Sequence, residues 1–184
     1  MTPIDLIHTL NLKDIPDAVK EQAKLSILDL IGIGAGGAGT RMSAIIRAHA
    51  AQEFGGTIPM LFDGRTASAQ GAALAAGMTI DSLDGHDGFN MAKGHIGAPL
   101  FPAILALGYE QQISGREVLL ATILGYEFGA RAAMAQHATA PDYHTSGSWG
   151  AVTAAAAGAY ILQLGTDQTR HALGIPNTTD RAVR

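Results

Sequence analysis

Small side chains limit the folds open to this chain more than any other feature of its sequence. Glycine makes up 23 of the 184 residues, and alanine recurs along the whole chain. Both residue types are depleted in β-strands, whereas small side chains let helices approach one another closely. The hydrophobic fraction of 47% is too high for a disordered chain. We therefore expect one domain of closely packed helices.

Apolar positions recur at helical spacing. Between residues 19 and 31 the apolar side chains fall three or four positions apart, at Val19, Ala23, Ile27 and Leu30, as in a helix that buries one face. The best strand candidate is residues 58–62, which Asp63-Gly64 closes with a turn signal. These patterns predict an all-α fold with at most one short strand or hairpin near residues 57–65.

Local signals also predict where several helices begin and end. Thr2-Pro3 has the order of a helix start, and Ser114-Gly115-Arg116-Glu117 has the form of a capping box. Thr66 is expected to cap a helix of small residues that runs to about residue 83. The last helix is expected to end at Gly174-Ile175-Pro176, because glycine followed by proline commonly stops a helix.

Charge and cysteine content exclude several kinds of protein. The net charge of −4 argues against a nucleic-acid partner, and the absence of cysteine excludes disulfides and thiolate metal sites. Residues 145–164 are uncharged, but they are mostly Ala, Gly, Ser and Thr, which insert weakly into membranes. We expect a cytoplasmic protein without a membrane partner, in which this stretch forms a buried helix.

A glycine-rich segment raises a nucleotide-binding hypothesis. Gly32-Ile33-Gly34-Ala35-Gly36-Gly37 matches the G-x-G-x-x-G pattern, which lets a backbone approach a pyrophosphate. The pattern needs a preceding strand, yet residues 25–31 belong to a longer helical pattern, and Asp29 would lie without an evident partner in a buried strand. An NAD-type dinucleotide site is therefore a third hypothesis, beside a glycine-rich helix end packed on its neighbours.

The segment best equipped for chemistry is a glycine-rich loop. Carboxylates beside imidazoles raise imidazole pKa values and fix their tautomers, and a lysine complements an anionic substrate. This combination suits proton transfer at a carbon next to a carboxylate. A metal site and a solvated structural loop are the alternatives, but the spacing matches no compact metal motif, so we expect no metal. Six ionisable side chains fall within fifteen positions: Asp81, Asp84, His86, Asp87, Lys93 and His95.

A second polar loop covers residues 139–148 and precedes an alanine-rich helix. Free backbone N–H groups at the start of that helix favour a bound carboxylate. His144 in this loop can serve as an acid, a base or an anion ligand, although a lone histidine is also a common capping or packing residue. A serine-hydrolase site is weakly supported, since G-x-S-x-G is absent.

Several short segments, taken in order, resemble a known family. They are Leu83-Asp84-Gly85-His86-Asp87 with Lys93-Gly94-His95, Pro99-Leu100-Phe101-Pro102-Ala103, Ser114-Gly115-Arg116-Glu117 with Gly125-Tyr126-Glu127, the second polar loop, and Leu164-Gly165-Thr166-Asp167 with His171-Ala172-Leu173-Gly174-Ile175. Their order and spacing resemble the MmgE/PrpD family, which contains 2-methylcitrate dehydratase, cis-aconitate decarboxylase and iminodisuccinate epimerase. The resemblance runs from about Pro3 to Ile175.

This resemblance implies a fold, a chemistry and a set of site residues. The family has a large helical domain with a smaller α+β lid, and its reactions move a proton beside a carboxylate without a metal or organic cofactor. The substrate would be a small di- or tricarboxylic acid. Which histidine acts as the base stays open. By position, the catalytic residues would be Asp84, His95 and His144, and the substrate-binding residues would be Asp87, Lys93 and Thr145.

The chain also departs from the family pattern. His86 stands where the family has an acid, and Ile96 and Thr145 stand where it has proline. Family members are much longer, so residues 1–176 are expected to be an incomplete N-terminal helical domain without the lid, and residues 177–184 a tail outside the family. We expect a truncated lyase or isomerase that is inactive alone and a homodimer if complete. The alternative is a non-catalytic helical interaction domain.

Overall fold

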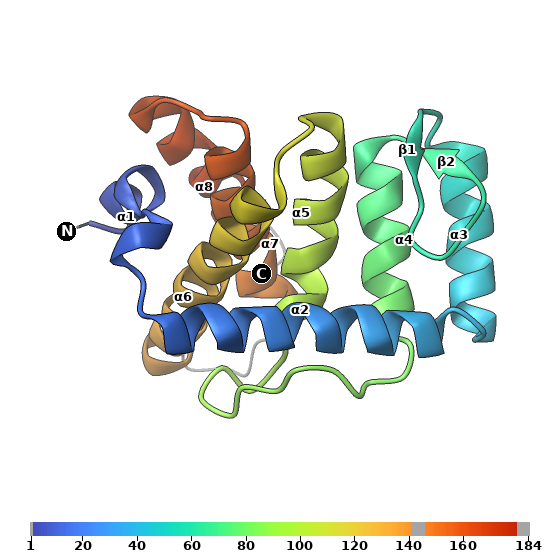
Figure 1. Cartoon of the computed structure of the whole chain (residues 1–184), viewed down its shortest axis with the longest axis horizontal. Coiled ribbons are helices and arrows are strands. Elements are labelled where there is room, and N and C mark those ends of the chain that lie inside the picture. The colour runs from blue at the N-terminus through green and yellow to red at the C-terminus, as the bar shows by residue number, and fades with distance from the viewer. Residues whose placement is uncertain (1, 141–145, 180–184) are drawn as a thin grey trace.

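The computed structural model describes residues 2–140 and 146–179 of the chain. Its described part is helical apart from one small hairpin (Figure 1), which confirms the all-α prediction. The elements in order are α1 (Pro3–Thr9), a 3-10 helix (Leu12–Asp14), α2 (Asp17–Gly37), α3 (Arg41–Glu53), β1 (Ile58–Pro59), β2 (Thr66–Ala67), α4 (Ala69–Asp81), α5 (Gly97–Glu110), α6 (Gly115–Thr139), α7 (Ser146–Ile161) and α8 (Thr166–Thr179).

Helix α2 crosses one side of the bundle (Figure 1). It packs against α4, α5 and α6 in turn, and α5 lies centrally with contacts to α4, α6 and α7. The loop between α4 and α5 runs beside α2, on the lower side in Figure 1. Because α2, α5 and α6 all reach this loop, the fold gives a long irregular segment a rigid support on which to hold functional side chains.

Close helix contacts explain the glycines of the sequence. A β-carbon at Gly125 on α6 would lie 2.3 Å from Cδ1 of Leu100 on α5. Similarly, a β-carbon at Gly37, the last residue of α2, would lie 2.2 Å from the carbonyl oxygen of Thr79 on α4. Both helix pairs therefore need glycine to reach their packing distance, which agrees with the helix-on-helix packing expected from composition.

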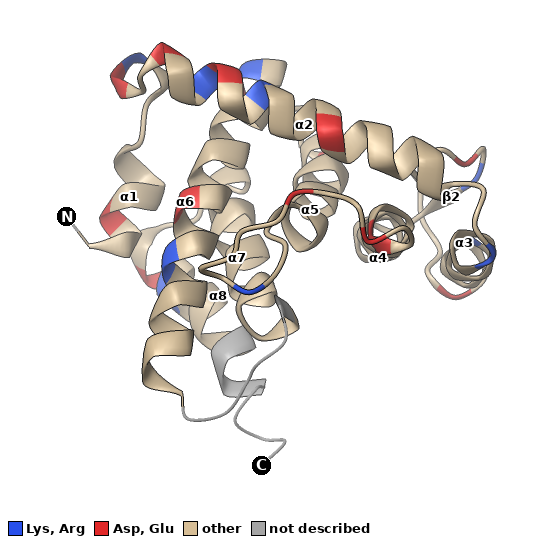
Figure 2. Ribbon diagram, turned by 90° about the horizontal axis from the view of Figure 1, so that it is seen from below, with Lys and Arg blue, Asp and Glu red and all other residues tan. Residues whose placement is uncertain are grey.

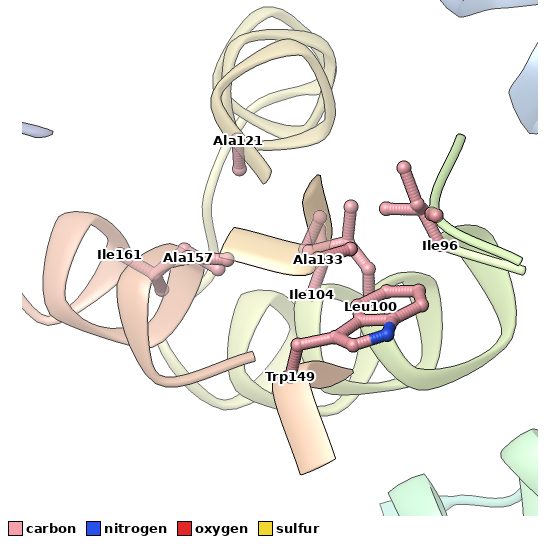
Figure 3. Packing of buried hydrophobic residues seen from close by; sticks show 9 residues of the cluster. Ile96, Leu100, Ile104, Ala121, Ala133, Trp149, Ala157 and Ile161 are labelled. Carbon is pink, nitrogen blue, oxygen red and sulfur yellow. The ribbon is translucent and has the colours of Figure 1, made fainter. Parts of the chain in front are cut away.

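The largest core cluster surrounds Trp149 on α7. Its indole is 2% exposed and lies among side chains of α5, including Leu100 and Ile104 (Figure 3). Ala121 and Ala133 of α6 close the other side of this cluster. Small alanines opposite one large indole let three helices share a single core layer.

Polar side chains cap the starts of several helices. Thr2 with Asp5, and Ser114 with Glu117, form the capping boxes of α1 and α6, as the sequence signals indicated. The predicted role of Thr66 as a cap is wrong. Thr66 and Ala67 instead form β2, which pairs antiparallel with β1, and Ser68 caps α4 through the N–H of Gly71. The hairpin lies near the predicted residues 57–65: β1 covers only residues 58–59 of the expected strand 58–62, and β2 follows just beyond the range at residues 66–67.

Two helices continue through residues expected to end or weaken them. Helix α2 extends to Gly37 and includes the whole G-x-G-x-x-G segment. A dinucleotide fold needs a strand and a turn there, so the nucleotide hypothesis is wrong for this chain. Helix α8 runs to Thr179, past the predicted stop at Gly174-Ile175-Pro176. A proline removes only one backbone donor, and packing of α8 on α1 and α7 outweighs that loss.

Among the described helices, α6 alone is long and apolar enough to cross a membrane by length and composition. In the fold it packs against α5, α7 and α2. The stretch considered at the sequence level, residues 145–164, supplies α7, whose Trp149, Ala156 and Ala157 are buried.

Candidate functional site

The loop between α4 and α5 is folded tightly enough to hold its side chains in place. The N–H of Phe89 donates to the carbonyl of Gly94 (3.1 Å), which closes a turn at residues 90–93. Lys93 adopts a positive φ of 51° at this turn. The imidazole Nε2 of His137 on α6 contacts the carbonyl of Ala92 (2.8 Å), so the turn is also tied to the bundle.

Asp87 organises the centre of the loop. Its Oδ2 accepts a hydrogen bond from the N–H of Gly97 (3.0 Å), the first residue of α5, where a carboxylate also meets the positive end of the helix dipole. Its Oδ1 lies 3.3 Å from Nδ1 of His86. Its backbone carbonyl accepts a short hydrogen bond from Nδ1 of His95. One residue therefore anchors α5 and both histidines.

The close approach of α5 to Asp87 requires glycine at position 97. A β-carbon there would lie 2.5 Å from Oδ1 of Asp87 and 2.7 Å from the Tyr126 hydroxyl. Any other residue would push Asp87 away from the helix start. The glycine is thus a condition for the arrangement of the two histidines.

His86 is held between two carboxylates. Its side chain is fully buried, with Nε2 3.1 Å from Oδ1 of Asp81 and Nδ1 on Asp87. Burial by itself lowers the pKa of His86, but the hydrogen bonds and negative charges of Asp87 and Asp81 outweigh it, so the pKa is raised above 6.5. Since carboxylates only accept hydrogen bonds, this geometry suits an imidazolium with both nitrogens protonated.

His95 is oriented by a different kind of partner. A carbonyl oxygen can only accept, so the contact with Asp87 fixes a proton on Nδ1 of His95. The other nitrogen, Nε2, lies 3.2 Å from Oδ1 of Asp84, whose side chain is 83% exposed. The rings of His86 and His95 lie with their centroids 4.1 Å apart at an angle of 53°. His95 thus offers Nε2 to the solvent side beside a carboxylate.

The structure brings together three of the six predicted site residues. Asp84, Asp87 and His95 lie in one connected group of hydrogen bonds and ion pairs. Lys93 is exposed, at the turn of the same loop. The predicted catalytic His144 and substrate-binding Thr145 lie outside the described residues, so their place stays a prediction.

Two residues of this region were not predicted as site residues. His86 was counted among the six ionisable side chains of the loop but not among the predicted catalytic or substrate-binding residues, yet it occupies the buried centre of the group. The hydroxyl of Tyr126, on α6, is buried without a hydrogen-bond partner among the described residues. Burial, with the negative charge of Asp87, raises the pKa of this phenol. In the sequence, Tyr126 stood out only as part of Gly125-Tyr126-Glu127, one of the segments that resemble the family.

A cavity of about 560 Å³ lies beside this group, between α2, α6 and the loop. Asp87, Phe89 and Tyr126 form its wall towards the histidines, and most of the rest is apolar, with Glu127 as a second carboxylate. Its lining, as far as the structure describes it, contains no lysine or arginine. The cavity therefore offers mainly apolar surface, a phenol hydroxyl and two carboxylates, but no cation for a substrate carboxylate.

The loop group also contains side chains of the kinds that bind transition metals. One ligand atom each from Asp84, His86 and His95 lies within 4.8 Å of the other two. The fold thus assembles residues whose spacing in the sequence matched no metal motif.

The helical fold and a loop of paired acids and histidines define the class of protein, and comparison of the sequence agrees. The model of the MmgE/PrpD N-terminal domain matches residues 4–184, and the chain belongs to this family. The match reaches the last residue, and the expected boundary at residue 176 stays a prediction.

Two fungal relatives show how far the similarity extends. The cis-aconitate decarboxylase-like protein oryM of Aspergillus oryzae is 29% identical over 183 residues, which is 94% of this chain and 38% of the relative. The cis-aconitate decarboxylase of Aspergillus terreus is 30% identical over 176 residues, 90% of this chain and 36% of the relative. The chain thus spans little more than a third of the length of these relatives.

Proposed function

We propose that this chain carries the proton-transfer loop of a cofactor-independent lyase or isomerase that acts on a small di- or tricarboxylic acid. The observation that supports it most is the pairing of Asp84 with Nε2 of His95 at 3.2 Å, while Nδ1 of the same ring is held by Asp87. A ring with one nitrogen fixed and the other beside a carboxylate is arranged to exchange a proton at a single atom.

Decarboxylation of a cis-aconitate-like acid is the reaction we favour, because both fungal relatives carry cis-aconitate decarboxylase in their names. In this reaction the bond between carbon and the departing carboxylate breaks and CO₂ leaves. The electron pair stays on carbon, which then takes a proton. An imidazolium at His95 would deliver that proton from Nε2, and Asp84 would stabilise the charged ring before delivery. Dehydration and epimerisation use the same ring as a base first.

The charges of the loop bear on substrate binding. Lys93 is the one Lys or Arg in the segment 82–97, where Asp84 and Asp87 contribute negative charge. A carboxylate of the substrate would pair with Lys93, and the predicted roles of His144 and Thr145 would add further polar contacts. A tricarboxylate needs more positive charge than one lysine supplies, and so the 184-residue chain alone, which the sequence predicts to be inactive, is expected to retain at most slow turnover of such an acid.

Turnover in deuterated water tests this proposal. The chain would be incubated with cis-aconitate in ²H₂O, and CO₂ release and deuterium in the product would be followed by NMR. We expect slow turnover that falls by about 10²-fold in His95→Asn, as for loss of a general acid. His49→Asn, on α3, is the matched control and should leave the rate unchanged. Equal rates in His95→Asn and the unaltered chain would contradict the proposal.

A second candidate function, a helical interaction domain, is favoured by the outer face of α2. Charged residues gather on the first half of this helix, and its second half is uncharged after Asp29 (Figure 2). In the middle of the helix, just before Asp29, Leu25 and Leu28 are 59% and 64% exposed, and exposed apolar area of this kind is common on binding surfaces. Sedimentation velocity tests it: association that Leu28→Glu abolishes supports this function, and a monomer at all concentrations argues against it.

A further inference from the structure

We propose that Asp84, His86 and His95 form a binding site for one divalent transition-metal ion, of which Zn²⁺ is the reference. The inference does not rest on the proposed function, since it concerns binding in the absence of substrate. It begins from the geometry: one ligand atom from each residue lies within 4.8 Å of the other two. Two imidazoles with one carboxylate form a donor set that suits Zn²⁺ and its neighbours.

The distances need only a modest contraction. Ligand atoms about 2.0–2.1 Å from a tetrahedral Zn²⁺ lie roughly 3.3–3.5 Å from one another. Nε2 of His95 and Oδ1 of Asp84 are already 3.2 Å apart. The largest of the three separations, up to 4.8 Å, must shorten by roughly 1.3–1.5 Å for a tetrahedral ion. Asp84, whose side chain is 83% exposed, can move for this, whereas the side chain of His86 is buried.

The outer partners of the ligands are also in place. Histidine ligands of metals usually hold their second nitrogen on a carboxylate or a backbone carbonyl. His95 has Nδ1 on the carbonyl of Asp87, so its Nε2 is the nitrogen that would bind the ion. His86 has one nitrogen on Asp87 and the other on Asp81. For Nε2 of His86 to bind the ion, it must lose the proton that the two carboxylates favour and release Asp81. Asp81 is 58% exposed and can move into solvent, leaving Asp87 as the partner that orients His86.

An ion at this position would have an open side. The three ligands come from the bundle-facing and outer sides of one loop, and Asp84 and His95 are exposed by 83% and 28%. The remaining coordination position would face solvent, as in zinc sites that keep a water molecule. Metal bound to Nε2 of His95 would occupy the atom proposed to transfer the proton. Zn²⁺ is therefore expected to inhibit turnover, not to support it.

Isothermal titration calorimetry of the metal-free chain with ZnCl₂ tests the site. We expect one site, with affinity at least about tenfold weaker in Asp84→Asn and in His86→Asn. His49→Asn should bind like the unaltered chain, and MgCl₂ should give no heat from this site, because Mg²⁺ prefers oxygen ligands. Asp84→Asn is the decisive variant, since its exposed side chain can change without loss of the fold.

Cobalt provides a second measurement that does not depend on affinity. Co²⁺ bound to two imidazoles and a carboxylate gives visible absorption bands, which should disappear in Asp84→Asn or His95→Asn. Zinc affinity and cobalt spectra that stay unchanged in these variants would overturn the assignment, and so would the absence of any zinc binding by the folded chain. If the chain does not bind zinc but His95→Asn still loses turnover as expected, the metal site alone is rejected and the proposed function stands.

Discussion

His86 and His95 lie with their rings 4.1 Å apart, and a single residue, Asp87, contacts Nδ1 of both. The two rings nevertheless meet different surroundings. His86 is enclosed by carboxylates, and His95 presents Nε2 to an exposed one. The surroundings of His86 suit a buried cation that fixes the loop, and those of His95 suit the proton exchange proposed for it.

Replacement of Gly97 should disturb this arrangement. A β-carbon at this position would lie 2.5 Å from Oδ1 of Asp87, so Gly97→Ala is expected to destabilise the fold by about 1–3 kcal/mol through overpacking. Gly32→Ala is the matched control, because a β-carbon there meets nothing within 4 Å. In the middle of α2 it should stabilise by about 0.5–1 kcal/mol. Urea unfolding of both variants measures these changes in the free energy of unfolding. Equal changes in the two variants would contradict the prediction.

The stability contributed by His86 should depend on pH. The pKa of His86 in the folded chain is raised above its ordinary value of 6.5 by its carboxylate partners, despite its burial. Its contribution is therefore complete below that value and is lost as the pH rises through the folded-state pKa. The stability difference between the unaltered chain and His86→Asn, measured by urea unfolding from about pH 6 to pH 9, should shrink with rising pH. A stability difference that grows with rising pH would show that folding lowers the pKa of His86, contrary to the prediction.

Asp63, between the two strands of the hairpin, makes a second pH-dependent contribution to stability. Hydrogen bonds from Arg65 lower the pKa of Asp63 from 3.8 to about 2, with Arg47 3.7 Å away. Its stabilisation is present above the unfolded value of 3.8 and is lost as the pH falls through about 2. Asp63→Asn should cost about 1 kcal/mol at neutral pH. This difference in stability between the unaltered chain and Asp63→Asn should vanish in acid. A difference that stays the same in acid would argue against the pairing of Asp63 with Arg65.

Substitutions of Trp149 test the packing of the largest core cluster. Its indole is buried, but its N–H has no hydrogen-bond partner in the described part of the chain. Trp149→Ala should cost about 3–5 kcal/mol by leaving a cavity. Trp149→Phe should lose much less, because no hydrogen bond is broken. Thermal unfolding followed by circular dichroism measures both, and equal losses would show that the indole nitrogen has a partner.

The sequence was sufficient for the class of fold and for the segment in which acids and histidines come together. Helical spacing and capping signals at residues such as Ser114 act locally, so they survive folding unchanged. The central place of His86 could not be predicted, since it depends on a loop without periodicity that folds against α5. The same holds for Gly97. Glycine is needed there because Asp87 and Tyr126 approach so closely that a β-carbon would collide with them.

Prediction from the sequence failed where one residue type serves two purposes. The glycines from Gly32 to Gly37 match a phosphate-binding pattern, but they lie inside α2, where Gly37 lets the helix end close to α4. Thr66 has the side chain of a helix cap, but pairing with Pro59 places it in a strand. Tertiary contacts decided both cases, and no local signal distinguishes them.

The tautomer of His95 is the most direct test of the proton-transfer proposal. It can be measured by ¹⁵N NMR of the imidazole nitrogens in the histidine-labelled chain, with His95→Asn to assign the signals. The geometry predicts a neutral ring with its proton on Nδ1, donated to the carbonyl of Asp87, and a bare Nε2 beside Asp84. A neutral ring with its proton on Nε2 and a bare Nδ1 would contradict the account.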